Sequence, residues 1–180
     1  MTEVILTIGP QYAGKSTFCK KVVELNPDIY FVSRDDILME LFGTVWLGSY
    51  SGGHHIAYEI MWKKAKRLIK KKPRLLILDC WNGPTRERLW ITDRLKKLGI
   101  SNVIGWYFVT PFNQCVEWSL GRDPPKHERE KEWRKIEFNH IYNDFHRQSV
   151  ETEKGFQNIV RINPLIDTPE QMVERLKVLV

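Results

Sequence analysis

Short apolar segments alternate with longer amphipathic segments along the chain. The apolar segments are rich in Val, Ile, Leu and Phe, which is typical of strands buried on both faces of a parallel sheet. They cover residues 4–8, 29–33, 75–79, 102–109 and 158–162. The amphipathic segments predict helices over residues 15–25, 35–42, 55–71, 85–98, 113–120, 132–150 and 169–179, with Thr85 as the N-cap of the fourth. This alternation predicts an α/β fold, a five-stranded parallel sheet with helices on both faces.

The chain is expected to form one domain over residues 1–180. This length suffices to bury a sizeable core, and no repeat or linker divides it. No apolar run approaches the roughly 20 residues that span a bilayer. The first residues, MTEVILTIG, lack the basic start of a secretory signal. We therefore expect a cytoplasmic protein with no membrane partner and no obligate protein partner.

Composition adds a modest electrostatic signal. The chain has 28 Lys and Arg against 22 Asp and Glu, a net charge of +6, and 12% aromatic residues. These values favour anionic partners such as nucleotides or nucleic acid. The basic run at residues 63–72 could follow a nucleic-acid backbone, although a solvated helix face is favoured. Cys19, Cys80 and Cys115 lack the spacing of a zinc site and are expected to be buried thiols, and no histidine is assigned to a metal.

Residues 9–16, GPQYAGKS, match the G-x-x-x-x-G-K-[ST] pattern (Walker A) at every fixed position. The pattern follows a predicted strand and opens a predicted helix, so its backbone N–H groups can surround phosphate oxygens. It predicts a P-loop NTPase-like three-layer sandwich that binds ATP and Mg²⁺. Lys15 would contact the β- and γ-phosphates and Ser16 would bind Mg²⁺. The residues expected to bind ATP in this segment are Gly9, Gln11, Tyr12, Ala13, Gly14, Lys15, Ser16 and Thr17.

Carboxylates follow two strands, at the sheet edge where parallel α/β proteins bind ligands. After the second strand, Asp35 is the candidate general base for an acceptor hydroxyl, with Arg34 beside it. The alternative is that Asp35 or Asp36 only caps the next helix. Asp79, at the end of the third strand, would support Mg²⁺ through an intervening ligand, or would orient the acceptor.

The segment GRDPPKHERE, residues 121–130, is predicted to be a charged, proline-broken loop. It lies in a predicted lid of about residues 113–134. A mobile lid can deliver an arginine to the charge on a transferred phosphoryl group, and Arg122 is the candidate. Arg129 and Arg134 are expected to be solvated surface charges.

The strings ILTIGPQYAGKST, FVSRDDI and LLILD, with Arg122 in the lid, resemble the P-loop kinase domain of phage-type polynucleotide 5′-kinases over about residues 1–125. The resemblance implies that Lys15 and Ser16 contact phosphate and Mg²⁺, and that Asp35 activates the acceptor hydroxyl. It implies that Asp79 is the second active-site aspartate and that Arg122 contacts the donor phosphates. The implied reaction transfers the γ-phosphate of ATP to a hydroxyl of DNA or RNA, most directly a polynucleotide 5′-OH. An origin in a phage, with action in the host cytoplasm, fits this family.

Two positions depart from that family. An arginine expected three residues after the base is Leu38, and a lid arginine expected near position 118 is Trp118. A larger aromatic acceptor surface could use Trp46, Tyr50 or Trp81. The departures keep other functions open: a kinase of 5-hydroxymethyl-pyrimidine bases in DNA, a small-molecule kinase acting on a nucleoside, sugar or antibiotic, and a nucleotide-dependent switch without an acceptor.

Overall fold

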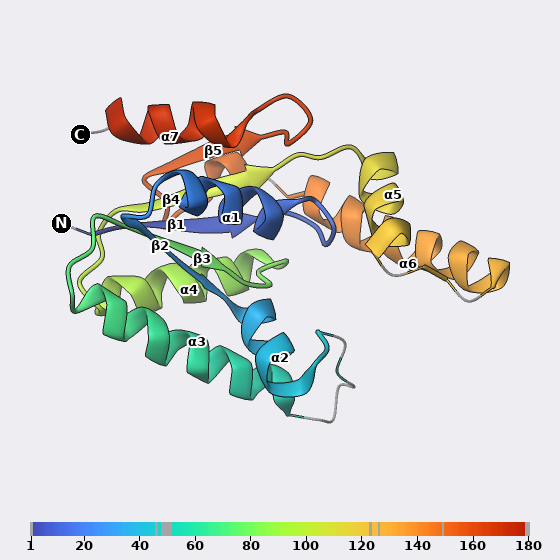
Figure 1. Cartoon of the computed structure of the whole chain (residues 1–180), viewed down its shortest axis with the longest axis horizontal. Helices are drawn as coiled ribbons and strands as arrows, with labels where there is room; N and C mark the ends of the chain where they lie inside the picture. Colours follow the sequence, from blue (N-terminus) through green and yellow to red (C-terminus); the bar gives the residue numbers. More distant parts are fainter. Residues whose placement is uncertain are drawn as a thin grey trace.

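The computed structural model describes residues 2–45, 47, 52–122, 124–125, 127–148 and 150–178. Its centre is a five-stranded parallel sheet in the order β2-β3-β1-β4-β5 (Figure 1). The strands are β1 (Glu3–Ile8), β2 (Ile29–Ser33), β3 (Leu75–Asp79), β4 (Val103–Phe108) and β5 (Asn158–Ile162). The helices are α1 (Lys15–Leu25), α2 (Arg34–Phe42), α3 (Gly53–Ile69), α4 (Thr85–Lys97), α5 (Phe112–Arg122), α6 (Glu128–His146) and α7 (Pro169–Val178), with a 3₁₀ turn η1 (Val150–Thr152).

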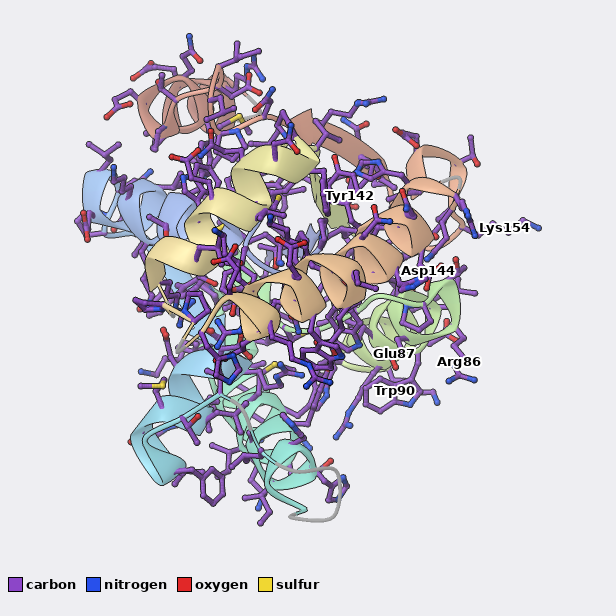
Figure 2. All side chains as sticks on the ribbon, turned by 90° about the vertical axis from the view of Figure 1, so that its right-hand side faces the viewer. Arg86, Glu87, Trp90, Tyr142, Asp144 and Lys154 are labelled. Carbon is purple, nitrogen blue, oxygen red and sulfur yellow. The ribbon has the colours of Figure 1, made fainter. Side chains whose placement is uncertain are left out.

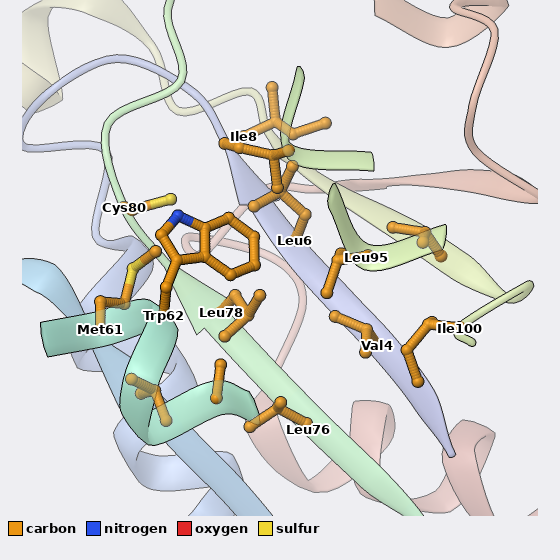
Figure 3. Close-up of a cluster of buried hydrophobic side chains, with 14 of the residues drawn as sticks. Val4, Leu6, Ile8, Met61, Trp62, Leu76, Leu78, Cys80, Leu95 and Ile100 are labelled. Carbon is orange, nitrogen blue, oxygen red and sulfur yellow. The ribbon is translucent and has the colours of Figure 1, made fainter. Parts of the chain in front are cut away.

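The sheet separates two hydrophobic layers, because successive side chains of a strand point to opposite faces. One layer packs under α2, α3 and α4 and includes Val4, Leu6, Ile8, Leu38, Met61, Trp62, Leu76, Leu78, Leu95 and Ile100 (Figure 3). The other packs under α1 and α7 and includes Ile5, Phe18, Val22, Ile77, Trp106, Phe108, Met172 and Leu176. The α/β three-layer architecture with a parallel sheet is therefore confirmed.

The strand register brings the functional loops to one edge of the sheet. β1 lies between β3 and β4, with Ile5 opposite both Ile77 and Ile104. Ser33 at the end of β2 lies opposite Asp79 at the end of β3. The loop after β1, the start of α2 and the loop after β3 therefore meet at the carboxyl edge, as the alternation of elements predicts.

The segment before α6 differs from its prediction. Residues 121–130 were expected to be a loop and the next helix to begin at residue 132, but α5 continues to Arg122 and α6 begins at Glu128. The side chain of His127 caps α6 by accepting a hydrogen bond from the Glu130 N–H at 3.1 Å. Glu128 and Glu130 add negative charge to the first turn, where the helix dipole favours it. The two helices project beyond the carboxyl edge of the sheet (Figure 1).

The structure also shows the positions of Thr85 and of the three cysteines. Thr85 is not the N-cap of α4: Pro84 holds that place, and the Thr85 hydroxyl instead donates to Glu153 at 2.8 Å. Cys19, Cys80 and Cys115 are buried free thiols, as expected. Burial raises the pKa of both Cys80 and Cys115 to about 12, so these thiols stay protonated and unreactive. In the described part of the chain, no helix combines the length and the apolar character needed to cross a membrane.

Candidate active site

Residues 9–16, the phosphate-binding loop, turn tightly between β1 and α1. Gly9 has φ 141° and Gly14 has φ 80°, both in the region that favours glycine. A Cβ at Gly9 would lie 3.0 Å from the carbonyl oxygen of Phe108, so the backbone of β4 approaches too closely for a side chain. Thr110, just after β4, donates its hydroxyl to the Ala13 carbonyl at 2.7 Å and fixes the far side of the loop. The loop is therefore held open by its neighbours, with its N–H groups at the start of α1.

Lys15 is a half-buried cation of this loop. Its ammonium group donates to the carbonyls of Gly9 at 3.1 Å and Pro10 at 2.7 Å. Burial lowers the pKa of Lys15, while the nearby negative charges of Asp79 and Asp35 oppose that shift. Asp79 and Asp35 therefore both lie near enough to Lys15 for their negative charges to act on it.

Asp79 holds Ser16 in position. Its carboxylate is 4% exposed and accepts hydrogen bonds from the Thr7 hydroxyl at 2.6 Å and the Ser16 hydroxyl at 2.5 Å. A serine that donates its proton to a carboxylate keeps its oxygen lone pairs for a metal ion, so this pair fits Mg²⁺ with Ser16 as ligand and Asp79 behind it. The burial of Asp79 favours this arrangement over direct contact with the acceptor.

Asp35 lies in the first turn of α2 without capping it. The N-cap is Ser33, whose hydroxyl accepts from the Asp36 N–H at 3.2 Å. Asp36 pairs with Lys20 at 2.7 Å, on the exposed side of the helix. The Asp35 side chain is 46% exposed and accepts from Arg34 at 2.7 Å. The capping alternative therefore does not explain Asp35, and its carboxylate stays open to a substrate.

A cleft of about 570 Å³ lies between the phosphate-binding loop and the two helices α3 and α4, and its lining includes Arg34, the ion-pair partner of Asp35. It is lined by Gln11, Arg34, His54, His55, Tyr58, Glu59, Trp81, Glu87, Trp90 and Ile91. Gln11, which the sequence predicts to contact ATP, is among the residues that line this cleft. Figure 2 looks onto the carboxyl edge and shows Glu87 and Trp90 close together on α4. The volume and the mixed aromatic and polar lining are typical of a small-molecule site.

Of the remaining predicted residues that the structure describes, only Trp81 lines this cleft. A Cβ at Gly14 would lie 3.0 Å from the Trp118 ring of α5 and 3.5 Å from Pro164, which follows β5. Arg122 is the exposed last residue of α5, and Thr17 is exposed on α1. The Tyr12 ring packs against Phe138 of α6, with centroids 6.0 Å apart. Of the aromatic acceptor candidates, Trp81 lines the cleft, whereas Trp46 and Tyr50 lie outside the described residues.

The basic run at residues 63–72 lies away from this site. The cleft is lined by residues 54–59 at the start of α3. From there α3 runs back toward the amino ends of the strands, where it leads into β3 (Figure 1). Lys64 pairs with Glu40 on the surface. The solvated-face interpretation of this run is therefore favoured over a nucleic-acid track.

Sequence reasoning missed a buried network behind the cleft. Arg88 of α4 is fully buried and donates to the carbonyls of Asn82 at 2.7 Å and Gly83, and to Glu153 at 2.6 Å through Nε. Asn82 in turn donates to the Thr7 carbonyl at 2.6 Å. Arg88 thus fixes the loop that carries Trp81 and ties it to the chain after η1. Nothing in the sequence distinguishes this arginine from the exposed cations of α4.

Replacing Arg88 tests this network. We expect Arg88→Ala to lower the free energy of unfolding by about 3–5 kcal/mol, because it leaves the buried carboxylate of Glu153 without its partner. Urea denaturation followed by tryptophan fluorescence measures the change. Arg86→Ala, an exposed arginine on the same helix, is the matched control and should shift stability by about 0.5 kcal/mol or less. Equal losses in both variants would contradict a stabilising role specific to Arg88.

Several solved structures share this fold at low sequence identity. The tunicamycin resistance protein of Deinococcus radiodurans aligns with TM-score 0.63 and 17% identity, covering 99% of this chain and 95% of that one. Shikimate kinase from Acinetobacter baumannii aligns with TM-score 0.56 and 14% identity, over 99% and 93%. A chain of the Pnkp1/Rnl/Hen1 RNA repair complex aligns with TM-score 0.66 and 15% identity, over 81% of this chain but 44% of that one. At these identities the likeness establishes the fold alone.

Sequence comparison identifies the family. No curated protein matches the chain significantly. The family AAA_33, described as "AAA domain", matches residues 4–139, which run from β1 into α6 and contain the phosphate-binding loop, Asp35, Asp79 and Arg122. With well over half of its length matched and a P-loop kinase fold around the match, the chain belongs to the AAA_33 family.

Proposed function

We propose that this protein is an ATP-dependent phosphotransferase that acts on an alcohol hydroxyl, with Asp35 as the general base. The position of Asp35 carries the proposal: an open carboxylate that is not used as a cap lies close enough to Lys15 to oppose the lowering of its pKa. A nucleotide switch has no need of such a group. The kinase fold of the structural neighbours supports the same reaction class.

The proposed transfer uses residues on both sides of the phosphate-binding loop. Asp35 takes the proton of the acceptor hydroxyl, whose oxygen forms a bond to the γ-phosphorus as the bond to the leaving ADP oxygen breaks. Lys15, Arg122 from the lid and the N–H groups of the loop stabilise the negative charge on the phosphates. Mg²⁺, held through Ser16 with Asp79 behind it, would supply further charge neutralisation.

For the acceptor, the site favours a small molecule over a polynucleotide end. Position 38, where the related 5′-kinases are expected to carry an arginine, holds a leucine with no exposed surface. The basic run at residues 63–72 is remote from the cleft. The SRDD segment and the fold shared with the RNA repair complex keep a polynucleotide 5′-OH as the second candidate, and hydroxymethylated DNA bases as a third.

Incubation with γ-labelled ATP and an acceptor panel tests the proposal. The panel comprises free nucleosides, 5′-OH DNA, 5′-OH RNA and DNA with hydroxymethylated bases. We expect label to appear on a free small molecule with equimolar release of ADP. Label on oligonucleotide ends or internal bases would support the second or third candidate instead. ATP binding without acceptor-dependent ADP release in any arm would contradict a phosphotransferase.

A further inference from the structure

The walls of the cleft present aromatic rings in fixed orientations. The Tyr58 hydroxyl donates to the backbone carbonyl of Trp81, which joins α3 to the loop after β3. The Trp81 ring packs edge-on against Phe145 at 5.7 Å. On the opposite wall, the guanidinium of Arg94 lies 5.1 Å from the centroid of Trp90 and holds that ring against α3. Rings held in this way are suited to a flat ligand, because stacking requires little further ordering.

The charges in the cleft disfavour a phosphorylated acceptor. Arg34 is the only Lys or Arg in the described lining, and it is paired with Asp35 at 2.7 Å. Of the two glutamates, Glu59 lies 3.6 Å from Arg94. Glu87, in the first turn of α4, has no ion-pair partner among the described residues. The uncompensated charge is therefore negative, so it repels phosphate and attracts an amino group.

One further polar atom in the cleft lacks a partner. Nδ1 of His54, at the start of α3, is buried and makes no hydrogen bond within the described part of the chain. Buried polar atoms in folded proteins are almost always paired, so this one indicates a ligand group or a bound water. The cleft thus offers stacking surfaces, a carboxylate without an ion-pair partner among the described residues, and an imidazole with an unpaired nitrogen.

We propose that the acceptor is an unphosphorylated nucleoside with an amino group on its base, of the class of adenosine and cytidine. The base stacks against Trp81 and Trp90, its amino group faces Glu87, and a sugar hydroxyl reaches Asp35 next to Arg34, whose guanidinium lies 5.5 Å from the centroid of the Tyr58 ring. That hydroxyl gives its proton to Asp35 and its oxygen takes the γ-phosphoryl group of ATP, with ADP as the leaving group. This inference rests on the proposed phosphotransferase function and narrows its acceptor.

Binding can be measured without turnover in the unsubstituted protein, because a non-hydrolysable ATP analogue blocks transfer while Asp35 still neutralises Arg34. With the nucleotide site saturated by Mg²⁺ and a non-hydrolysable ATP analogue, calorimetry compares adenosine with adenosine 3′-monophosphate. We expect adenosine to bind at least about tenfold more tightly. Trp90→Ala, at a half-exposed ring, should weaken adenosine about tenfold through lost stacking. Glu87→Gln should lower the ratio of the affinity for adenosine to that for adenosine 3′-monophosphate severalfold. Glu170→Gln, in the first turn of α7 across the sheet, should leave this ratio unchanged.

The outcomes separate this inference from the function on which it rests. Absent adenosine binding, equal binding of the 3′-phosphate, or an unchanged preference in Glu87→Gln would overturn the nucleoside assignment. If adenosine binds in the expected pattern but the unsubstituted protein transfers no label to it, the phosphotransferase proposal fails while the binding site remains. If label passes efficiently to a phosphorylated acceptor, the phosphotransferase proposal stands and the assignment of an unphosphorylated nucleoside fails.

Discussion

Asp35→Asn is expected to reduce kcat for phosphoryl transfer by about 10²–10⁴ while ATP affinity changes by less than about threefold. An amide matches the shape of the carboxylate and can still accept the hydrogen bond from Arg34, but it cannot take the proton of the attacking hydroxyl. The large effect should therefore fall on the chemical step alone. Transfer of label from γ-labelled ATP gives the rate, and calorimetric titration gives the affinity.

Asp36→Asn is the matched control for that experiment. Asp36 is the adjacent carboxylate in the same helical turn, 48% exposed and paired with Lys20. Its loss removes a surface ion pair of small energetic value, so the rate should stay within about threefold. Asp35 is not the general base if the Asp35→Asn enzyme keeps a tenth of its activity. The same conclusion follows if Asp35→Asn and Asp36→Asn lose activity equally.

Lys15→Ala is expected to lower the transfer rate by about 10²–10³ or more, and to weaken ATP binding as well. Lys15 is half-buried, and its ammonium group donates to the loop carbonyls, where water screens its charge less than at the surface. A triphosphate in the loop would replace those carbonyls as its partner and gain a strong interaction that grows as charge develops in transfer. The same two assays measure both effects.

Two further variants make the lysine test specific. Lys20→Ala removes an exposed cation from the same helix and should leave transfer within about threefold. Lys15→Arg keeps the charge but substitutes a broad planar group for a compact one, so we expect it to stay well below the unsubstituted rate. If Lys15→Ala retained most of its activity, the phosphate-binding loop would have no catalytic function.

Much of the fold could be predicted because its signals are local. The bounds of β2, β3, β5 and α1 agree residue for residue with the segments read from the apolar pattern. The start of α6 was missed because a histidine supplies its N-cap, outside the usual Ser, Thr, Asp and Asn. The Thr85 cap was wrong because its hydroxyl is used in the network of Arg88, which only tertiary packing creates.

The residues expected to bind the donor could also be identified from the sequence, whereas the residues that line the cleft could not. The phosphate-binding loop is contiguous in sequence, so its spacing alone indicates its chemistry. The cleft combines side chains of α3, α4 and the loop after β3, and its composition depends on how those helices pack. Tyr58, Glu87 and Trp90 each fit an ordinary amphipathic helix, so no pattern singles them out. The roles assigned to Asp35, Asp79 and Arg122 stay predictions until the variants are measured.

β1 lies at the centre of the sheet, and the groups proposed to bind the donor and the acceptor come from different elements around it. Groups proposed to hold the donor come mainly from the loop after β1 and the start of α1, with Arg122 added from the chain beyond β4, while every lining residue of the cleft other than Gln11 comes from the chain that follows β2 or β3. Under the proposed function, substitutions on α3 or α4 would change which acceptor is phosphorylated while leaving the nucleotide site intact. Such a partition would let relatives with the same nucleotide machinery diverge widely in their substrates, and it makes the α3–α4 wall the place to redesign acceptor choice.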